Sequence, residues 1–380
     1  MLSRNDIKKA KRIIIKIGSS ILTDEKNIID EKFLDHLAAQ IKLLQTKGKE
    51  IIIVSSGAVA AGMMVLNLKQ KPKSISEKQA LAAFGQGFLI AKYNDIFSKF
   101  DMLIAQVLLT SEDIADRKRY LNAKNTLESL ISKKIIPIIN ENDTVATSEI
   151  KLGDNDNLSA EVACLLEADL LIILSDVEGF YDNDPKISKD AKVIDTVSDI
   201  SRYIEKASSK SGTILGTGGI YTKLQAAQKV TIMGIPCVLA KGKMENVITK
   251  ILKGEKIGTF FVPIEKRISH RKYFIAFNVK PKGRIIIDDG AKEAIIKKGK
   301  SLLPSGIIKA SGNFDIGDVV EIEDKKNNKI ARGLVNYSAI EVEKIKGIKS
   351  SEIEKKLGYK YEDEVIHRNN LVLITKKDLL

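Results

Sequence analysis

Six short, almost continuously apolar runs alternate with longer amphipathic stretches over about the first 260 residues. The runs are rich in β-branched residues, which is typical of strands buried on both faces of a parallel sheet. They cover Arg12–Ile17, Glu50–Val54, Met102–Leu109, Ile135–Ile139, Leu170–Leu174 and Pro236–Ala240. Apolar residues recur at helical spacing between them, over residues 33–44, 77–99, 111–132, 157–167 and 220–233. The alternation predicts an α/β sandwich with a mainly parallel sheet and right-handed crossovers.

The pattern changes after about residue 260. The apolar runs become shorter, and turn residues such as Asp289-Gly290 and Ser311-Gly312-Asn313 separate them. These runs cover Arg284–Ile287, Val319–Ile322, Ala331–Val335 and Leu371–Ile374. We therefore predict an α/β domain over residues 1–262, a linker over 263–281 and a small β-rich domain over 282–380.

Composition narrows the class of protein. Of the 380 residues, 44% are hydrophobic and 29% are charged, which is typical of a globular chain and excludes a disordered chain or a fibre. The two cysteines exclude a disulfide scaffold and a cysteine-based zinc site. The three histidines lie far apart in sequence, so we expect no protein-bound metal site.

The formal net charge of +13 is compatible with a nucleic acid, a membrane surface or an anionic substrate as partner. The last 100 residues contain 20 Lys and Arg against 16 Asp and Glu, and lysines alternate with acids throughout the chain, which favours a generally solvated surface. No segment approaches the ~18 uninterrupted apolar residues of a membrane span. Ile13–Ile15 is too short for a secretory signal, so we expect a cytoplasmic protein.

Small and polar residues follow several of the predicted strands. In an α/β sheet, ligands bind beyond the carboxyl ends of the strands, so these residues are expected to meet at one edge. The segments are Lys16–Ser20, Ser55–Ala58, Asn140–Asp143 and Ser175-Asp176, together with Gly153–Asn157 and Gly216–Gly219, each at the start of a predicted helix. The sequence therefore predicts one composite site.

Two of these glycine-rich turns carry lysines, Lys16 and Lys223. Helix N-termini present free N–H groups to phosphate, and lysine supplies a mobile charge for phosphoryl oxygens. A Walker A motif, a dinucleotide fingerprint after the first strand and the protein-kinase motifs are all absent from the sequence. Taken alone, Gly18-Ser19-Ser20 could be only a tight turn, and Asn140–Asp143 could only cap a helix.

Together the motifs are similar to the amino-acid kinase family, whose members phosphorylate a carboxylate, carbamate or phosphate oxygen with ATP. Ile14–Ser20, Val54–Gly62 and Leu174–Pro185 carry this resemblance. Three narrower motifs, Pro137–Thr147, Lys151–Ala160 and Gly216–Ala226, resemble those of the glutamate 5-kinase family. The last 100 residues resemble a PUA domain. The implied fold is an amino-acid kinase-like three-layer sandwich followed by a PUA-like domain.

The resemblance implies ATP-dependent phosphorylation of the γ-carboxylate of L-glutamate to L-glutamyl 5-phosphate, the first step of proline biosynthesis. Lys16 would contact the transferring phosphoryl group, Lys223 the nucleotide phosphates, and Asp156 would orient both lysines. Glutamate would be held by Ser56, Asp143 and Asn155. The ATP site would be lined by Gly18, Ser175, Asp176, Thr217, Gly218, Gly219 and Lys223. Mg²⁺ would arrive with ATP.

The same resemblance implies a homo-oligomer, feedback inhibition by proline and hand-over of the product to glutamate-5-semialdehyde dehydrogenase. Two alternatives stay open. A related kinase would keep the fold and act on another acceptor, such as aspartate or UMP. An RNA-binding protein would act through the C-terminal module, although the net charge of +4 over residues 281–380 and the scarcity of aromatic residues argue against it.

Overall fold

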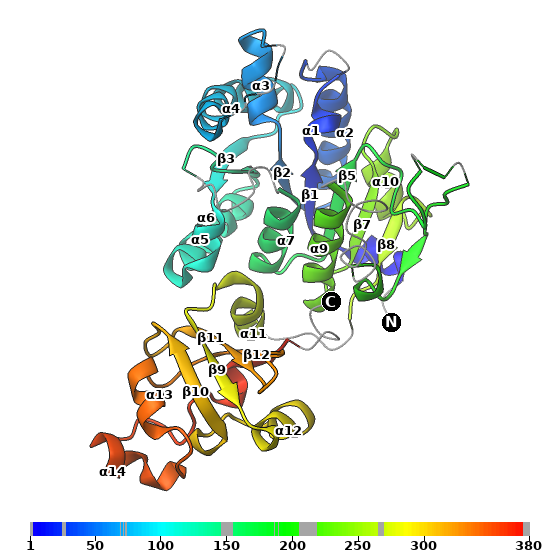
Figure 1. Ribbon diagram of the computed structural model, residues 1–380. Coiled ribbons are helices and arrows are strands. Elements are labelled where there is room, and N and C mark those ends of the chain that lie inside the picture. Colours follow the sequence, from blue (N-terminus) through cyan, green and yellow to red (C-terminus); the bar gives the residue numbers. More distant parts are fainter. Residues whose placement is uncertain are drawn as a thin grey trace. The chain divides into compact units, whose positions relative to one another are not determined.

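A computed structural model of the chain describes residues 3–24, 28–68, 70, 72, 74–145, 155–185, 187, 188, 190–204, 219–264 and 270–374, without the side chains of residues 270 and 271 (Figure 1). The chain forms two compact units, residues 1–267 and 268–380.

The described part of the first unit contains an eight-stranded sheet in the order β3-β4-β2-β1-β5-β7-β8-β6. Neighbouring strands are parallel except β7 and β8. The mainly parallel sheet predicted from the sequence is confirmed; the short β6 and β8 were not predicted. The strands are β1 (Arg12–Ile17), β2 (Glu50–Ser55), β3 (Ile104–Leu109), β4 (Ile136–Glu141), β5 (Leu170–Ser175), β6 (Thr196–Val197), β7 (Cys237–Lys241) and β8 (Thr259–Phe261).

Helices cover both faces of this sheet (Figure 1). They are α1 (Ser19–Leu22), α2 (Glu31–Thr46), α3 (Ala58–Val65), α4 (Ile75–Ser98), α5 (Ser111–Ala115), α6 (Arg117–Ser132), α7 (Asn155–Leu165), α9 (Gly219–Ile232) and α10 (Val247–Leu252), after a 3₁₀ turn at Arg4–Lys9. Helix starts follow local capping chemistry: the side chain of Asp30 accepts from Phe33 N at the start of α2. The predicted helix over 111–132 is interrupted at Asp116, whose side chain caps α6.

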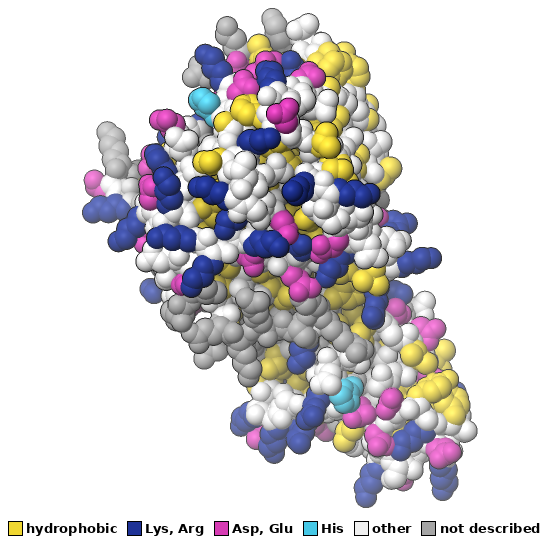
Figure 2. Space-filling view, turned by 180° about the vertical axis from the view of Figure 1, so that it is seen from behind, with side chains coloured by type: hydrophobic (Ala, Val, Ile, Leu, Met, Phe, Trp, Pro, Cys, Tyr) yellow, Lys and Arg dark blue, Asp and Glu magenta, His cyan; other side chains and the backbone are white. Residues whose placement is uncertain are grey.

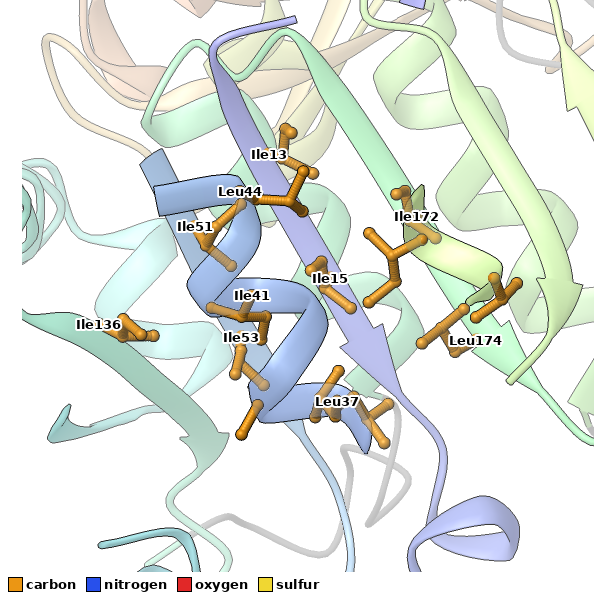
Figure 3. Close-up of a cluster of buried hydrophobic side chains, with 14 of the residues drawn as sticks. Ile13, Ile15, Leu37, Ile41, Leu44, Ile51, Ile53, Ile136, Ile172 and Leu174 are labelled. Carbon is orange, nitrogen blue, oxygen red and sulfur yellow. The ribbon is translucent and has the colours of Figure 1, made fainter. Parts of the chain in front are cut away.

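The alternation of side chains along β1 assigns its residues to two different layers. Ile13, Ile15 and Ile17 join a buried cluster with apolar residues of α2, and Figure 3 shows Leu37, Ile41 and Leu44 of that helix against the sheet. Ile14 and Lys16 point to the opposite face, where α7 packs. Because alternate side chains of β1 point to opposite faces of the sheet, Lys16 lies on the face that α7 covers, while Ile13, Ile15 and Ile17 lie in the core on the other face.

The second unit is a mixed five-stranded sheet in the order β10-β9-β11-β12-β13. The strands are β9 (Gly283–Ile287), β10 (Ile307–Gly312), β11 (Val319–Glu323), β12 (Lys329–Leu334) and β13 (Leu371–Leu373). The helices are α11 (His270–Tyr273), continued by a π-helical turn (Phe274–Asn278), then α12 (Asp289–Lys298), α13 (Ala339–Ile345) and α14 (Ile353–Leu357), with 3₁₀ turns at Pro304–Gly306, Ser350–Glu352 and Arg368–Asn370. Ile285, Ile322 and Val365 belong to its own apolar core.

The segment that the sequence suggested as a linker, 263–281, includes the helical residues 270–278. Ile275 and Ala276 pack there against Val319 and Val372 of the second sheet. Arg332 Nη1 also donates to the carbonyl of Ala276 at 2.7 Å. This stretch therefore contributes to the core of the second unit.

The surface carries charges of both signs. On the face shown in Figure 2, Lys and Arg are interleaved with Asp and Glu. Among the described residues, no helix is long and apolar enough to cross a membrane.

Candidate active site

Two lysines and one aspartate from three elements form a buried cluster, hereafter the lysine–aspartate triad. Lys16 Nζ lies 2.5 Å from Asp156 Oδ1, and Lys223 Nζ lies 3.0 Å from Asp156 Oδ2. The side chains of Lys16, Lys223 and Asp156 are 7%, 12% and 6% exposed. Because two cations share one carboxylate, the triad keeps a formal charge of +1 in a low-dielectric setting, which suits an anionic ligand.

The fold brings the triad together from residues far apart in sequence. Lys16 is near the carboxyl end of β1, Asp156 is in the first turn of α7 and Lys223 is in the second turn of α9. Thr222 Oγ1 donates to Asp156 Oδ2 at 2.8 Å, and Lys223 Nζ donates to the carbonyl of Gly219 at 2.9 Å. These bonds fix the direction of both the carboxylate and the Lys223 ammonium.

The electrostatics of the triad keep Asp156 ionised. Burial alone would raise the pKa of Asp156, but attraction to Lys16 and Lys223, with hydrogen bonds from Lys16 and Thr222, holds it below its usual value. A carboxylate held by two ammonium groups is a poor proton acceptor at neutral pH. Asp156 is therefore suited to orient lysines and unsuited to act as a general base.

A neutral hydrogen-bonded chain lies beside the triad, hereafter the amide network: Asn155, Asn140, Gln86 and Ser56. Asn155 Nδ2 donates to Ser56 Oγ at 3.0 Å and to Asn140 Oδ1 at 2.9 Å. Asn140 Nδ2 donates to Gln86 Oε1 at 2.8 Å. Asn155, Asn140 and Gln86 are all buried. The network therefore ties α7, β4, α4 and the end of β2 into one polar surface.

The turn after β2 places Ser56 in this network. Gly57 adopts φ 107°, a left-handed conformation that costs glycine little, and α3 begins at the next residue. Behind the turn, Ser55 Oγ lies 2.9 Å from the hydroxyl of buried Tyr93 on α4. Hydrogen bonding behind the turn thus anchors β2 where Ser56 projects.

Helices α3 and α4 pack unusually closely at Gly62 and Gly85. A Cβ atom at Gly85 would overlap the backbone of Ala58 and of Gly62, so only glycine permits this approach. Gln86 follows directly in α4. The close contact between Gly62 and Gly85 therefore fixes the position of Gln86 in the amide network.

Asp143, expected to hold substrate, lies half-buried in the loop after β4. Burial raises its pKa to about 6. Within the described residues, no hydrogen bond joins it to Ser56 or Asn155. No described cation forms an ion pair with Asp143, and a partly desolvated carboxylate of this kind favours a positively charged ligand group.

Of the remaining expected residues, Gly18 and Gly219 lie beside the lysines of the triad, because a Cβ atom on either would approach Lys16 Nζ or Lys223 Nζ within 4 Å. A Cβ atom built on Gly18 would lie 3.8 Å from Lys16 Nζ, and Gly18 N donates to Leu174 O at the end of β5. Ser175 Oγ donates to Asp176 Oδ1 at 3.0 Å; Ser175 is buried and Asp176 exposed. Gly219 is the first residue of α9. Thr217 and Gly218 lie outside the described residues.

Sequence reasoning assigned no individual role to two residues of the site, Asn140 and Gln86. Asn140 lies in the polar segment that follows the fourth predicted strand, but no role was assigned to it. Gln86 lies on the buried face of α4, which includes Leu89 and Tyr93. Gln86 is a polar residue at a position of the helical pattern that is otherwise occupied by apolar residues, and this exception could have indicated a role in the site.

Comparison with known proteins identifies the family of the chain. Residues 11–241 match the model of the amino acid kinase family, and residues 283–357 match the model of the PUA domain. The chain is 54% identical over 365 residues to a glutamate 5-kinase of Thermoanaerobacter sp. (strain X514), covering 96% of this chain and 98% of the relative. Glutamate 5-kinases of Dictyoglomus thermophilum and Citrifermentans bemidjiense are 51% and 48% identical, each covering 97% of this chain and 99% of the relative.

The first unit is a mainly parallel α/β sandwich with a cationic site at the carboxyl edge of its sheet. The kinase family model matches most of the same unit. The chain belongs to the amino acid kinase family and, within it, to the glutamate 5-kinase family. The family and fold predicted from the sequence are confirmed.

Proposed function

We propose that the protein transfers the γ-phosphoryl group of ATP to the γ-carboxylate of L-glutamate. A carboxylate oxygen forms the new bond to phosphorus, the bond from phosphorus to the β,γ-bridging oxygen breaks, and ADP leaves with the electron pair. The products are ADP and L-glutamyl 5-phosphate, and the reaction is the first step of proline biosynthesis. The family and the lysine–aspartate triad support this proposal.

The triad performs the electrostatic part of the reaction. An anionic carboxylate must approach a polyanionic nucleotide, and charge spreads over the phosphoryl oxygens in the transition state. Lys16 contacts the transferring phosphoryl group and Lys223 the nucleotide phosphates, both held by Asp156. Because the ammonium groups are oriented before substrates bind, little reorganisation accompanies the reaction.

No general base is needed at the acceptor. The γ-carboxylate of glutamate, with an unperturbed pKa of about 4.3, is already ionised at neutral pH. Asp156, which is engaged by two lysines, is therefore free of any proton-transfer role. The substrate's α-ammonium group meets Asp143 and the amide oxygen of Asn155, and Ser56 adds a hydroxyl.

The nucleotide occupies the side of the triad formed by Gly18, Ser175, Asp176 and the start of α9. Within the described residues, no group of three or more His, Cys, Asp or Glu could hold a metal ion. Both oxygens of Asp156 are engaged by lysines. These residues fit Mg²⁺ carried by the ATP phosphates, where it supplies charge neutralisation with few protein ligands.

The observation that carries the proposal is the pairing of buried Lys16 and partly buried Lys223 with the carboxylate of Asp156, beside the neutral amide network. The test supplies ATP and Mg²⁺ with L-glutamate, L-aspartate, N-acetylglutamate or UMP. ADP release is measured in each case, and hydroxylamine traps acyl phosphates as hydroxamates. We expect ADP release and hydroxamate with L-glutamate alone.

The outcomes separate the alternatives. Turnover with another acceptor and none with L-glutamate would overturn the substrate and keep the kinase class. No turnover with any acceptor would overturn the activity, and a salt-dependent RNA shift assay would then test the C-terminal unit.

We further propose, from the family, that the protein is a cytoplasmic homo-oligomer, that proline inhibits it and that it passes its product to glutamate-5-semialdehyde dehydrogenase. Light scattering tests the oligomeric state, and a proline titration of the rate tests the inhibition.

A further inference from the structure

The side-chain oxygen of Asn155 is buried and accepts no hydrogen bond from any described residue. Asn155 as a whole is 4% exposed. A buried acceptor without a donor costs free energy, and in native folds such an atom is commonly satisfied by an ordered water or a ligand. The nitrogen of the same amide is fully engaged by Ser56 and Asn140. The amide is thus held in the orientation that leaves its oxygen unpaired.

Backbone groups establish which amide atom is which. Asn155 Nδ2 lies 3.3 Å from the carbonyl of Ser55, which can only accept. Glu141 N, which can only donate, lies 2.9 Å from Asn140 Oδ1. Asn140 therefore presents its oxygen to Asn155 and its nitrogen away from it.

Gln86 accepts a hydrogen bond from the side-chain nitrogen of Asn140. Its Oε1 accepts from Asn140 Nδ2 at 2.8 Å, and Gln86 is 9% exposed. It is carried by α4 directly after Gly85, where the close contact with α3 fixes the helix position. Without this acceptor, Asn140 would keep a buried donor unpaired, and its present amide orientation would lose one of the hydrogen bonds that stabilise it against rotation.

We infer that Gln86 is a positioning residue for substrate selection: through Asn140 it keeps the oxygen of Asn155 facing the substrate's α-ammonium group. The inference rests on the proposed function. Rotation of Asn140 would offer a donor to Asn155, and the Asn155 amide would turn its own nitrogen towards the ligand. A cationic group would then meet a donor where it requires an acceptor.

Glutarate, which is glutamate without the α-ammonium group, separates this role from a general structural one. The experiment measures KM for L-glutamate and for ATP, and the inhibition constant of glutarate against L-glutamate. Gln86→Met and Gln86→Leu fill the space and remove the acceptor, whereas Gln86→Glu keeps it. We expect both apolar variants to raise KM for L-glutamate about 10- to 100-fold, and the glutarate constant and KM for ATP to stay within about twofold, because an acceptor facing a charged group is lost. Gln86→Glu should restore most of the affinity.

The chain offers a matched control in Gln40, which is 8% exposed. Its Oε1 accepts from the backbone of Ile248 at the start of α10, away from the amide network. Gln40→Met should lower the melting temperature and leave KM for L-glutamate unchanged. Unchanged KM in the apolar Gln86 variants, equal losses for glutamate and glutarate, or the same KM change in Gln40→Met would overturn the inference. If the unmodified protein makes no hydroxamate from L-glutamate, the proposed function fails instead.

Discussion

At one end of the site, Lys16 and Lys223 share the carboxylate of Asp156; at the other, Asn155, Asn140 and Gln86 exchange hydrogen bonds without any charge. Adjacent residues of α7, Asn155 and Asp156, belong to the two ends. Charge acts on the transition state, where phosphoryl oxygens gain or redistribute charge. Neutral amides act through geometry, because each has a donor and an acceptor that a ligand can distinguish.

We therefore expect substitutions in the triad and in the amide network to change different kinetic parameters. Changes in the triad should lower kcat, since its cations stabilise charge that develops during transfer. Changes in the amide network should raise KM for the acceptor, since its groups contact parts of the substrate that do not react. Variants that mix the two effects would weaken the comparison.

The largest effect is expected from Lys16→Met. Removing an oriented cation from the transferring group should lower kcat about 10²- to 10³-fold, with little change in KM for L-glutamate. The hydroxamate assay measures both parameters. Lys229→Met is the control, because Lys229 of α9 pairs with Glu161 of α7 at 3.1 Å, so that the variant removes another lysine–carboxylate pair of the same unit. An equal loss of kcat in that variant would contradict a specific role for Lys16.

Asp156→Asn should lower kcat about 10²-fold and also destabilise the protein. The substitution leaves Lys16 and Lys223 close together without their carboxylate, and loss of one partner of a buried ion pair costs about 3–5 kcal/mol. Urea unfolding followed by circular dichroism measures the change in free energy of unfolding. A variant as stable as the parent protein would show that the lysines need no carboxylate.

The pH profile tests the acceptor end through Asp143. Its pKa of about 6 means that this side chain is ionised above pH 6 and protonated below it. Because the ionised form attracts the α-ammonium group, kcat/KM for L-glutamate should fall about tenfold per pH unit below pH 6 and level off above it. Asp143→Asn should give a lower value that does not change across this range. A profile shared by the parent protein and the variant would exclude Asp143 as its source.

Ser56→Ala should give the smallest effect. It removes a hydroxyl that accepts from Asn155 Nδ2, which retains a second acceptor in Asn140. Loss of about 1 kcal/mol corresponds to about a fivefold rise in KM for L-glutamate, with kcat nearly unchanged. A large loss of kcat would place Ser56 at the phosphoryl end.

The sequence indicated all three residues of the lysine–aspartate triad, whereas in the amide network it indicated Ser56 and Asn155 and gave no role to Asn140 and Gln86. Lys16 and Asp156 lie in motifs at a strand end and a helix start, and parallel strands bring such ends to one edge. Gln86 reaches Asn140 because α4 packs closely against α3 through Gly62 and Gly85. That contact depends on tertiary packing, which hydrophobic periodicity does not encode.

The fold shows the same division. The run Arg12–Ile17 predicted β1 residue for residue, because a buried parallel strand is almost continuously apolar. The short strands β6 (Thr196–Val197) and β8 (Thr259–Phe261) have two and three residues, too few to give a pattern. Their pairing depends on neighbours already in place, as does the antiparallel direction of β8 against β7.

The most direct test of the two-ended site compares Lys16→Met with Asn155→Ala under identical conditions. Initial rates over a matrix of ATP and L-glutamate concentrations give kcat and both KM values for each variant. We expect Lys16→Met to lower kcat while KM for L-glutamate stays within about threefold, and Asn155→Ala to raise this KM about 10-fold or more while kcat changes less. Loss of the same parameter in both variants would contradict a division of the site into a charged and a neutral end.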